Sequence, residues 1–206
     1  TQSRFIYWTD HISAGSNWGT DTTSTYTSVI PITIDSLTGG TDDYAVTAGE
    51  MELAYDLFAD TESLDVNLVL GGPSSIVADT AAAMDTHVTM ITALVETRRD
   101  CVGFVSPYRA ATVGVALSNT ATKNVVDAFD LCPSSSYMVF DSGYKYMYDK
   151  YNDVYRFVPL NGDTAGLCAF TDQVADSFFS PAGFNRGNLR NAIKLSFNPK
   201  KSERDR

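Results

Sequence analysis

The sequence has 206 residues, of which 44% are hydrophobic and 19% charged, and its net charge is −10 at neutral pH. This length and composition are typical of globular proteins with one core, or with one domain and part of another. The acidic balance argues against a nucleic-acid-binding surface and against an anionic membrane surface, because both kinds of binding need basic patches. No apolar run reaches the ~20 residues that span a bilayer.

The first part of the chain predicts two short strands separated by a long irregular segment. Residues 4–9 are rich in aromatic and β-branched side chains, which are typical of a strand, and a second strand is expected over residues 29–34. Residues 10–28 between them are mostly Ser, Thr, Gly and Asn. Irregular segments of this length are usually functional or belong to an incomplete structure. Residues 1–35 are therefore treated as a region of their own.

Three continuous apolar runs follow, at residues 66–70, 101–105 and 137–140. Such runs suit strands that are buried on both faces of a parallel sheet. Helices are expected between them, because strand–helix alternation is typical of a parallel sheet with crossover connections.

The sequence also predicts where these helices begin and which faces they bury. Thr47 and Glu50 have capping-box spacing ahead of a helix that should run to about residue 61. Apolar residues recur at helical spacing over residues 77–95, where Ser74 or Ser75 can cap the helix. A third helix is expected to end near Phe129. The side chains expected to point inward are Met51, Ala54, Tyr55 and Phe58 in the first helix and Val125, Val126 and Phe129 in the third.

A hairpin is predicted after the third apolar run, because Tyr144, Tyr146 and Tyr148 alternate with other residues and the chain returns over residues 154–160. A half-buried sheet face, an interface anchor and a surface that stacks on sugars or bases all remain open for these tyrosines. A helix from residue 161, a strand over residues 188–197 and the start of a helix at residue 200 complete the chain.

The predicted fold class is α/β: a mainly parallel sheet with helices on both faces plus an antiparallel hairpin, with a partial second domain at the C-terminus. We expect an α/β core domain over residues 36–179. Residues 180–206 should form a connector loop, a strand and the helix start of the next domain.

Catalytic signals are weak. The loops at residues 71–75, 106–109 and 141–143 should meet at the carboxyl edge of the sheet, where such folds bind ligands. They lack the Gly-x-Gly-x-x-Gly and Walker patterns, and no Gly-x-Ser-x-Gly elbow is present. The only histidines, His11 and His87, cannot build a typical His-based metal site unaided. We expect no catalytic residue, no metal and no cofactor, and we expect the three separated cysteines to be reduced structural thiols.

One turn-rich segment, Ser180-Pro-Ala-Gly-Phe-Asn-Arg-Gly187, stands out. Its proline restricts the backbone and its glycines permit left-handed or closely packed conformations. From these properties alone it is a connector between domains.

This loop, followed by a strand and by Asn198-Pro199, closely resembles the contractile tail sheath proteins of myophages. The stretch Leu37-Thr-Gly-Gly-Thr-Asp42 is similar to a second motif of that family. The stretch from Tyr146 to Asp163 resembles its T-even branch. The resemblance covers roughly residues 37–206 and identifies the chain as a core fragment, and it implies that residues 1–35 border an inserted domain of the T-even-like sheaths.

The resemblance implies a structural subunit and not an enzyme. It also implies that the turn-rich segment is an interface or docking loop, formed by Ser180, Pro181, Gly183, Phe184, Asn185, Arg186 and Gly187. Sheath proteins stack as hexameric rings around a tail tube and contract to drive the tube through the host envelope. The implied partners are other copies of the sheath protein, the tail tube protein, and the baseplate and tail terminator proteins, with no nucleic acid and no membrane. The implied location is the virion tail, assembled in the host cytoplasm. A Rossmann-like nucleotide- or sugar-binding enzyme and a lectin-like module are the alternatives.

Overall fold

The computed structural model describes residue 40, residues 46–74 and residues 78–205. The chain divides into two compact units, Thr1–Asp43 and Tyr44–Arg206. Apart from Gly40, every described residue belongs to the second unit, and the account below concerns that unit. The strands expected over residues 4–9 and 29–34 lie outside the described residues.

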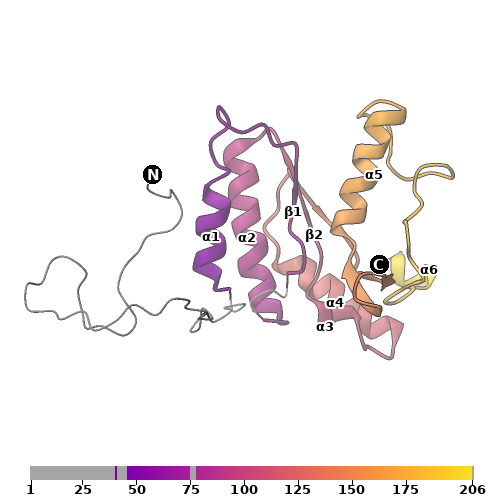
Figure 1. The fold of residues 1–206 in the computed structure, drawn as a ribbon. Helices are drawn as coiled ribbons and strands as arrows, with labels where there is room; N and C mark the ends of the chain where they lie inside the picture. The colour runs from indigo at the N-terminus through magenta and orange to yellow at the C-terminus, as the bar shows by residue number, and fades with distance from the viewer. Residues whose placement is uncertain (1–39, 41–45, 75–77, 206) are drawn as a thin grey trace, which may run out of the picture. The chain divides into compact units, whose positions relative to one another are not determined.

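A three-stranded parallel sheet forms the centre of this unit (Figure 1). Its strands are β1 (Leu68–Leu70), β2 (Val102–Val105) and β3 (Met138–Phe140), in the order β1-β2-β3. The three apolar runs of the sequence supply these strands, so the prediction of a parallel sheet is confirmed. The central strand is buried on both faces, since the neighbouring Phe104 and Val105 point to opposite sides and both are buried.

Two crossover connections place helices against this sheet. Helix α2 (Ala81–Arg98) joins β1 to β2, while α3 (Arg109–Thr112) and α4 (Ser118–Leu131) lie between β2 and β3. Helices α2 and α4 contact each other, and α1 (Ala48–Asp56) packs beside α2 (Figure 1). The buried core between the helices and the sheet consists of Val69, Met84, Val88, Ile91, Leu94, Val95, Cys101, Val105 and Ala128.

The close approach of α2 to the sheet depends on Gly103 in β2. A Cβ atom at this position would lie 2.5 Å from Sδ of Met138 and 3.0 Å from Cγ2 of Ile91. Real Cβ atoms essentially never approach within 3.0 Å, so a side chain here would displace the Met138 thioether and crowd Ile91 of α2.

Side-chain caps fix the first residues of α1 and α2. Thr47 caps α1 in the predicted capping box, in which Oε2 of Glu50 accepts a hydrogen bond from the Thr47 backbone N–H at 2.8 Å. Helix α1 ends at Asp56, earlier than expected, and Ala54 and Phe58 are exposed. Helix α2 is capped by Thr80 and not by Ser74, whose hydroxyl instead donates to the Ser106 carbonyl.

The predicted inner face of α4 is partly wrong. Val126 and Phe129 are exposed, and the residues of α4 that are buried are Ala121 and Ala128. Ala128 packs in the core with residues of α2 and the parallel sheet, and α3 also packs against α4, while the larger Val126 and Phe129 lie outside this core. Phe129 contacts the ring of Phe140 from β3, with their centroids 5.6 Å apart.

The hairpin belongs to a second, antiparallel sheet and does not pair with the parallel one. It consists of β4 (Tyr144–Asp149) and β5 (Val154–Pro159), and β6 (Lys194–Leu195) pairs with the other edge of β4. The expected strand over residues 188–197 is thus reduced to two residues. Asn191 has a left-handed backbone with φ 55°, which interrupts any longer strand.

A separate second domain at the C-terminus is not confirmed, because β6 completes the sheet that the hairpin begins. Helix α5 (Asn161–Val174) contacts β1 and β2, and the short helix α6 (Lys201–Arg204) follows β6. The fold class is therefore mixed α/β, with one parallel and one antiparallel sheet.

The end of α2 is fixed by the buried guanidinium of Arg98. It donates hydrogen bonds to the backbone carbonyls of Phe58, Asp60 and Leu64, at 2.6, 3.1 and 2.8 Å. It also forms a two-pronged ion pair with the carboxylate of Asp100, with both N–O distances 2.9 Å. Arg98 thereby holds the connection between α1 and β1 against the end of α2.

We expect Arg98→Ala to destabilise the protein strongly. The substitution leaves three backbone carbonyls without their donor, and each one that stays buried costs about 1–3 kcal/mol. The neighbouring Arg99 is a matched control, because its left-handed backbone (φ 60°) suits glycine, so Arg99→Gly should be neutral or slightly stabilising. Urea denaturation of the two variants measures the difference, and equal unfolding midpoints would contradict this role of Arg98.

Candidate functional site

The loops at the carboxyl edge of the parallel sheet meet, as the sequence predicts, and they bond to one another. The Ser106 hydroxyl, at the end of β2, donates to Oδ2 of Asp141 at the end of β3, with an O–O distance of 2.5 Å. The other carboxylate oxygen of Asp141 accepts from the Gly143 backbone N–H at 2.8 Å. The Ser74 hydroxyl donates to the Ser106 carbonyl at 3.0 Å.

Asn161, the first residue of α5, completes this network. Its backbone N–H donates to Oγ of Ser106 at 3.2 Å, and its side-chain Nδ2 donates to the carbonyl of Gly72 at 2.5 Å. Ser106 and Asn161 are both buried. The polar groups at this edge are therefore engaged with one another and do not present an open set of donors to a ligand.

Burial raises the pKa of the Asp141 carboxyl to about 7. The hydrogen bonds from Ser106 and Gly143 act in the opposite direction, because they favour the charged form, and the nearby Asp163 carboxylate raises the pKa further. Asp163 is itself paired with Lys145, whose Nζ lies 2.8 Å from its carboxylate. A carboxyl with a raised pKa is a common feature of active sites. Here, however, the groups that contact Asp141 are Ser106 and Gly143, which hold the ends of the strands together.

Among the described residues, the hydrogen-bond partner of His87 is a tyrosine and not a serine or cysteine nucleophile. It is buried beside α1, with Nε2 3.1 Å from the hydroxyl of Tyr55, and burial lowers its pKa. His11 lies outside the described residues. Within the described part of the chain no group of His, Cys, Asp and Glu residues is arranged to hold a metal ion, and all three cysteines are free thiols. None of the described helices combines the length and hydropathy that a bilayer span requires.

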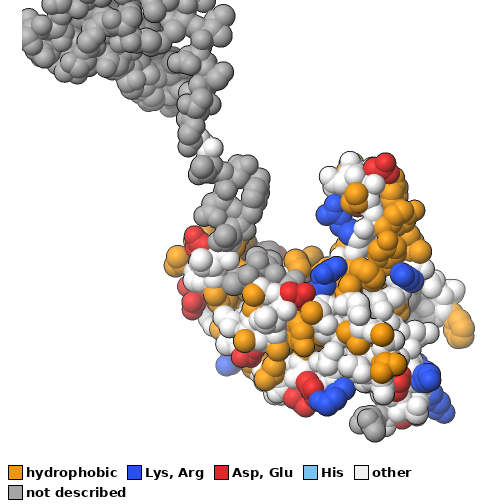
Figure 2. Space-filling view, turned by 90° about the horizontal axis from the view of Figure 1, so that it is seen from below, with side chains coloured by type: hydrophobic (Ala, Val, Ile, Leu, Met, Phe, Trp, Pro, Cys, Tyr) orange, Lys and Arg blue, Asp and Glu red, His pale blue; other side chains and the backbone are white. Residues whose placement is uncertain are grey.

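The hairpin presents an aromatic face. Its register pairs Tyr146 with Phe157 and Tyr148 with Tyr155, so these four rings lie on one side of the sheet. Their centroids are separated by 4.8 to 5.6 Å, and Nζ of Lys194 lies 5.1 Å from the Tyr146 ring centroid. Tyr155 is 56% exposed. Figure 2 shows that hydrophobic side chains also reach the surface elsewhere, with charged side chains between them.

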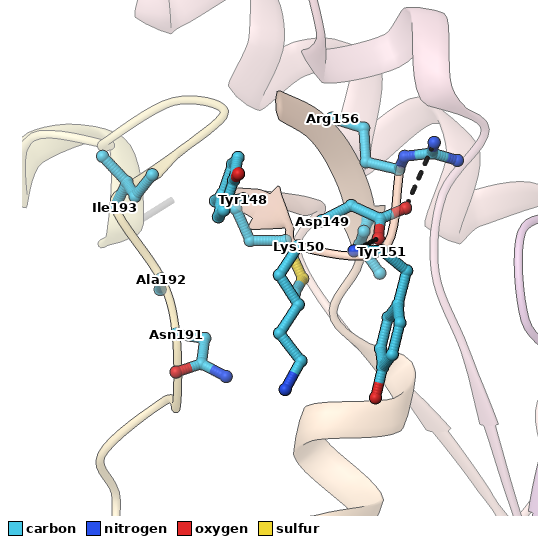
Figure 3. Close-up of a pocket in the computed structure, with 10 residues that line it drawn as sticks. Tyr148, Asp149, Lys150, Tyr151, Arg156, Asn191, Ala192 and Ile193 are labelled. Carbon is cyan, nitrogen blue, oxygen red and sulfur yellow. Dashed lines mark hydrogen bonds and ion pairs between the residues drawn. The ribbon is translucent and has the colours of Figure 1, made fainter. Parts of the chain in front are cut away.

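A groove of about 640 Å³ lies between the tip of this hairpin and residues 191–193 (Figure 3). Tyr148, Lys150 and Tyr151 lie on one side of it and Asn191 on the other. An ion pair of 3.2 Å joins Arg156 to Asp149, whose pKa is lowered chiefly by a hydrogen bond from the Asn152 side chain. The groove is open and mixed in polarity, which is more typical of a contact surface than of an enclosed binding pocket.

The Ser180–Gly187 segment forms a tight turn. The backbone N–H of Gly187 donates to the carbonyl of Gly183 at 2.9 Å. A Cβ atom on Gly187 would lie 3.0 Å from the Gly183 backbone nitrogen, and Gly183 has φ 157°. The turn presents the Phe184 ring entirely to solvent. The glycines are therefore explained by the backbone, whereas the exposed phenylalanine is not explained by packing within this unit.

Arg186 lies on the inner side of the turn. Its guanidinium carbon is 5.6 Å from the ring centroid of Phe179, within the range of a cation–π contact. Its Nε is buried and has no hydrogen-bond partner among the described residues. It lines a cavity of about 490 Å³ together with Arg190 and residues of α5. That this loop docks against another protein stays a prediction.

Sequence reasoning identified the three loops that meet at the sheet edge but missed Asn161. The signal available was Asn161-Gly-Asp163 directly after a strand, which indicates a helix start. It did not indicate that the side chain of Asn161 would bond to Gly72 at the edge of the parallel sheet, because these two residues are 89 positions apart in the sequence.

No family model matches the chain. The chain is 42% identical over 183 residues to the tail sheath protein of Enterobacteria phage T4, a match that covers 83% of this chain and 27% of that protein. It is 38% identical over 181 residues to the tail sheath protein of Vibrio phage KVP40, covering 81% and 26%. It is 31% identical over 199 residues to that of Salmonella phage ViI, covering 96% and 29%. The chain thus spans about a quarter of the length of these curated relatives.

We expect Asp141→Asn to change how stability depends on pH. The native Asp141 has a pKa of about 7, against an ordinary value of 3.8, so between these values the folded protein holds a proton that the unfolded chain releases. The contribution of Asp141 to stability is therefore complete below pH 4 and is lost as the pH rises through 7, by up to ~1.4 kcal/mol per pH unit.

Asparagine keeps a side-chain oxygen that can accept a hydrogen bond in this network, but its side chain does not titrate. The difference in unfolding free energy between the wild type and Asp141→Asn should consequently shift in favour of the variant from pH 4 to pH 8. Chemical denaturation at several pH values measures this difference, and a difference that is constant with pH would contradict the raised pKa.

Proposed function

Because the chain is homologous to a segment of the phage tail sheath proteins, we propose that it is a structural building block of a contractile tail sheath. The observation that carries this proposal is the 42% identity to the T4 tail sheath protein over 183 residues. The role is structural and not catalytic.

In the proposed role, copies of the protein stack as hexameric rings around a tail tube and contract to drive the tube through the host envelope. Its partners are other copies of itself, the tail tube protein, and the baseplate and tail terminator proteins. The protein is assembled in the host cytoplasm and resides in the virion tail. Contraction is then a rearrangement of rigid subunits, and its energy comes from their interfaces and not from nucleotide hydrolysis.

Two features of the described unit support a structural role. The carboxyl edge of the parallel sheet, where an enzyme of this class would bind its ligand, is occupied by Ser106, Asp141 and Asn161. The surface meanwhile exposes large apolar side chains such as Phe184 and Tyr155, which is typical of protein–protein contact sites. The first feature also argues against a Rossmann-like nucleotide- or sugar-binding enzyme.

The proposal predicts that the intact protein polymerises. Negative-stain electron microscopy should show hollow tubes with helical stacking, because sheath subunits have the contacts needed to assemble on themselves. Particles that stay small and uniform over a wide range of salt and protein concentrations would contradict the proposal.

We also expect Arg186→Ala to impair assembly more than stability. The guanidinium contacts Phe179 at the surface of the unit, and an exposed cation–π contact contributes only about 0.5–1 kcal/mol. Electron microscopy and urea denaturation of the same variant separate the two effects. Arg109→Ala is the matched control, since it removes an exposed arginine of α3 that lines neither the hairpin groove nor the cavity beside α5, and it should leave both assembly and stability unchanged. A large loss of stability with Arg186→Ala would instead make this arginine a residue that holds the fold together.

A further inference from the structure

The charges of this chain are strongly separated along the sequence. Residues 46–97 contain nine Asp and Glu residues and no Lys or Arg. Residues 186–206 contain seven Lys and Arg residues and only two acidic ones. The net charge of −10 is therefore not spread evenly along the sequence, because one segment is acidic and another is basic.

The acidic surface includes an exposed face of α1. Glu52 and Asp56 lie one turn apart on this helix, as do Leu53 and Leu57. The leucines are 69% and 74% exposed, and neither carboxylate forms an ion pair with any other described residue. This face thus offers two carboxylates beside two apolar side chains, and we name it the α1 face.

The basic surface surrounds the cavity beside α5. Arg186 and Arg190 line it, together with the apolar Leu167 and Phe170. Nε of Arg186 lacks a hydrogen-bond partner within the described residues, and the guanidinium of Arg190 lies 5.7 Å from the Phe170 ring centroid. The acidic residue that lines this cavity, Asp163, is already paired with Lys145. We name this surface the α5 cavity.

These two surfaces lie on opposite sides of the parallel sheet (Figure 1). Helix α1 packs on the outer side of α2, whereas α5 lies across β1 and β2 from it. They cannot meet within one copy of the unit. Contact between two different surfaces of identical chains is a head-to-tail interface, which produces closed rings or open helical assemblies.

We propose that the α1 face of one copy docks into the α5 cavity of a second copy. Glu52 and Asp56 supply carboxylates to the guanidiniums of Arg186 and Arg190, since arginine binds carboxylates through paired hydrogen bonds. Leu53 and Leu57 cover the apolar lining of the cavity. This inference rests on the proposed function, because it names one contact through which the sheath subunits assemble.

Charge reversal in the intact protein tests the pairing. The acidic-face variant Glu52→Lys/Asp56→Lys and the cavity variant Arg186→Glu/Arg190→Glu should each lose the tubes seen by electron microscopy and the pelleted fraction in sedimentation. An equimolar mixture of the two variants should recover both, because every altered face then meets a partner of opposite sign. A variant that merely failed to fold would not be rescued by mixing.

A matched control carries the same change of charge elsewhere. Asp127→Lys/Asp130→Lys alters two exposed carboxylates of α4 and should leave assembly unchanged. The pairing is overturned if either reversed variant assembles like the wild type, if the mixture stays unassembled, or if the α4 control also abolishes assembly. A wild-type protein that forms no tubes would instead contradict the proposed function itself.

Discussion

The buried hydrogen bonds among Ser106, Asp141 and Asn161 are the constraint on which the rest of the described unit depends. They join the ends of β2 and β3 to the first residue of α5, and Asn161 extends the network to the loop after β1. A buried polar group without a partner is costly, so these side chains must be positioned together. Helix α5 is thereby fixed against the sheet. The same bonds occupy the edge at which folds of this class usually bind ligands, which leaves the surface as the place for function.

The elements that could be predicted from the sequence are those whose causes are local. The capping box of Thr47 and Glu50 lies within one helical turn, and the alternation of Tyr144, Tyr146 and Tyr148 follows from the pleat of a single strand. Apolar runs bounded by turn residues likewise located all three parallel strands. In each case the residues that carry the signal are also the residues that form the structure, so no knowledge of distant contacts was needed.

Features that depend on distant contacts could not be predicted in this way. Val126 and Phe129 have the spacing of an inner face, but Ala128 takes the core position of α4 against α2 and the sheet, and these larger residues are exposed. The separate antiparallel sheet depends on β6, which is 45 residues or more from its partner strand. In the candidate docking loop, backbone chemistry explains the glycines, whereas the exposed Phe184 and the unpaired Nε of Arg186 become visible only in three dimensions.

The distribution of charge connects this interior to the proposed assembly. Two pairs of buried or half-buried charges, Arg98 with Asp100 and Lys145 with Asp163, are formed within the unit, so these charges need no neighbour to neutralise them. Glu52 and Asp56 of the α1 face form no ion pair with any other described residue. An exposed ion pair contributes only about 0–1 kcal/mol, so contacts of this kind can be exchanged without unfolding a subunit. In the proposed assembly, these interior charges would stay paired within each copy, and the carboxylates of the α1 face would pair with another copy.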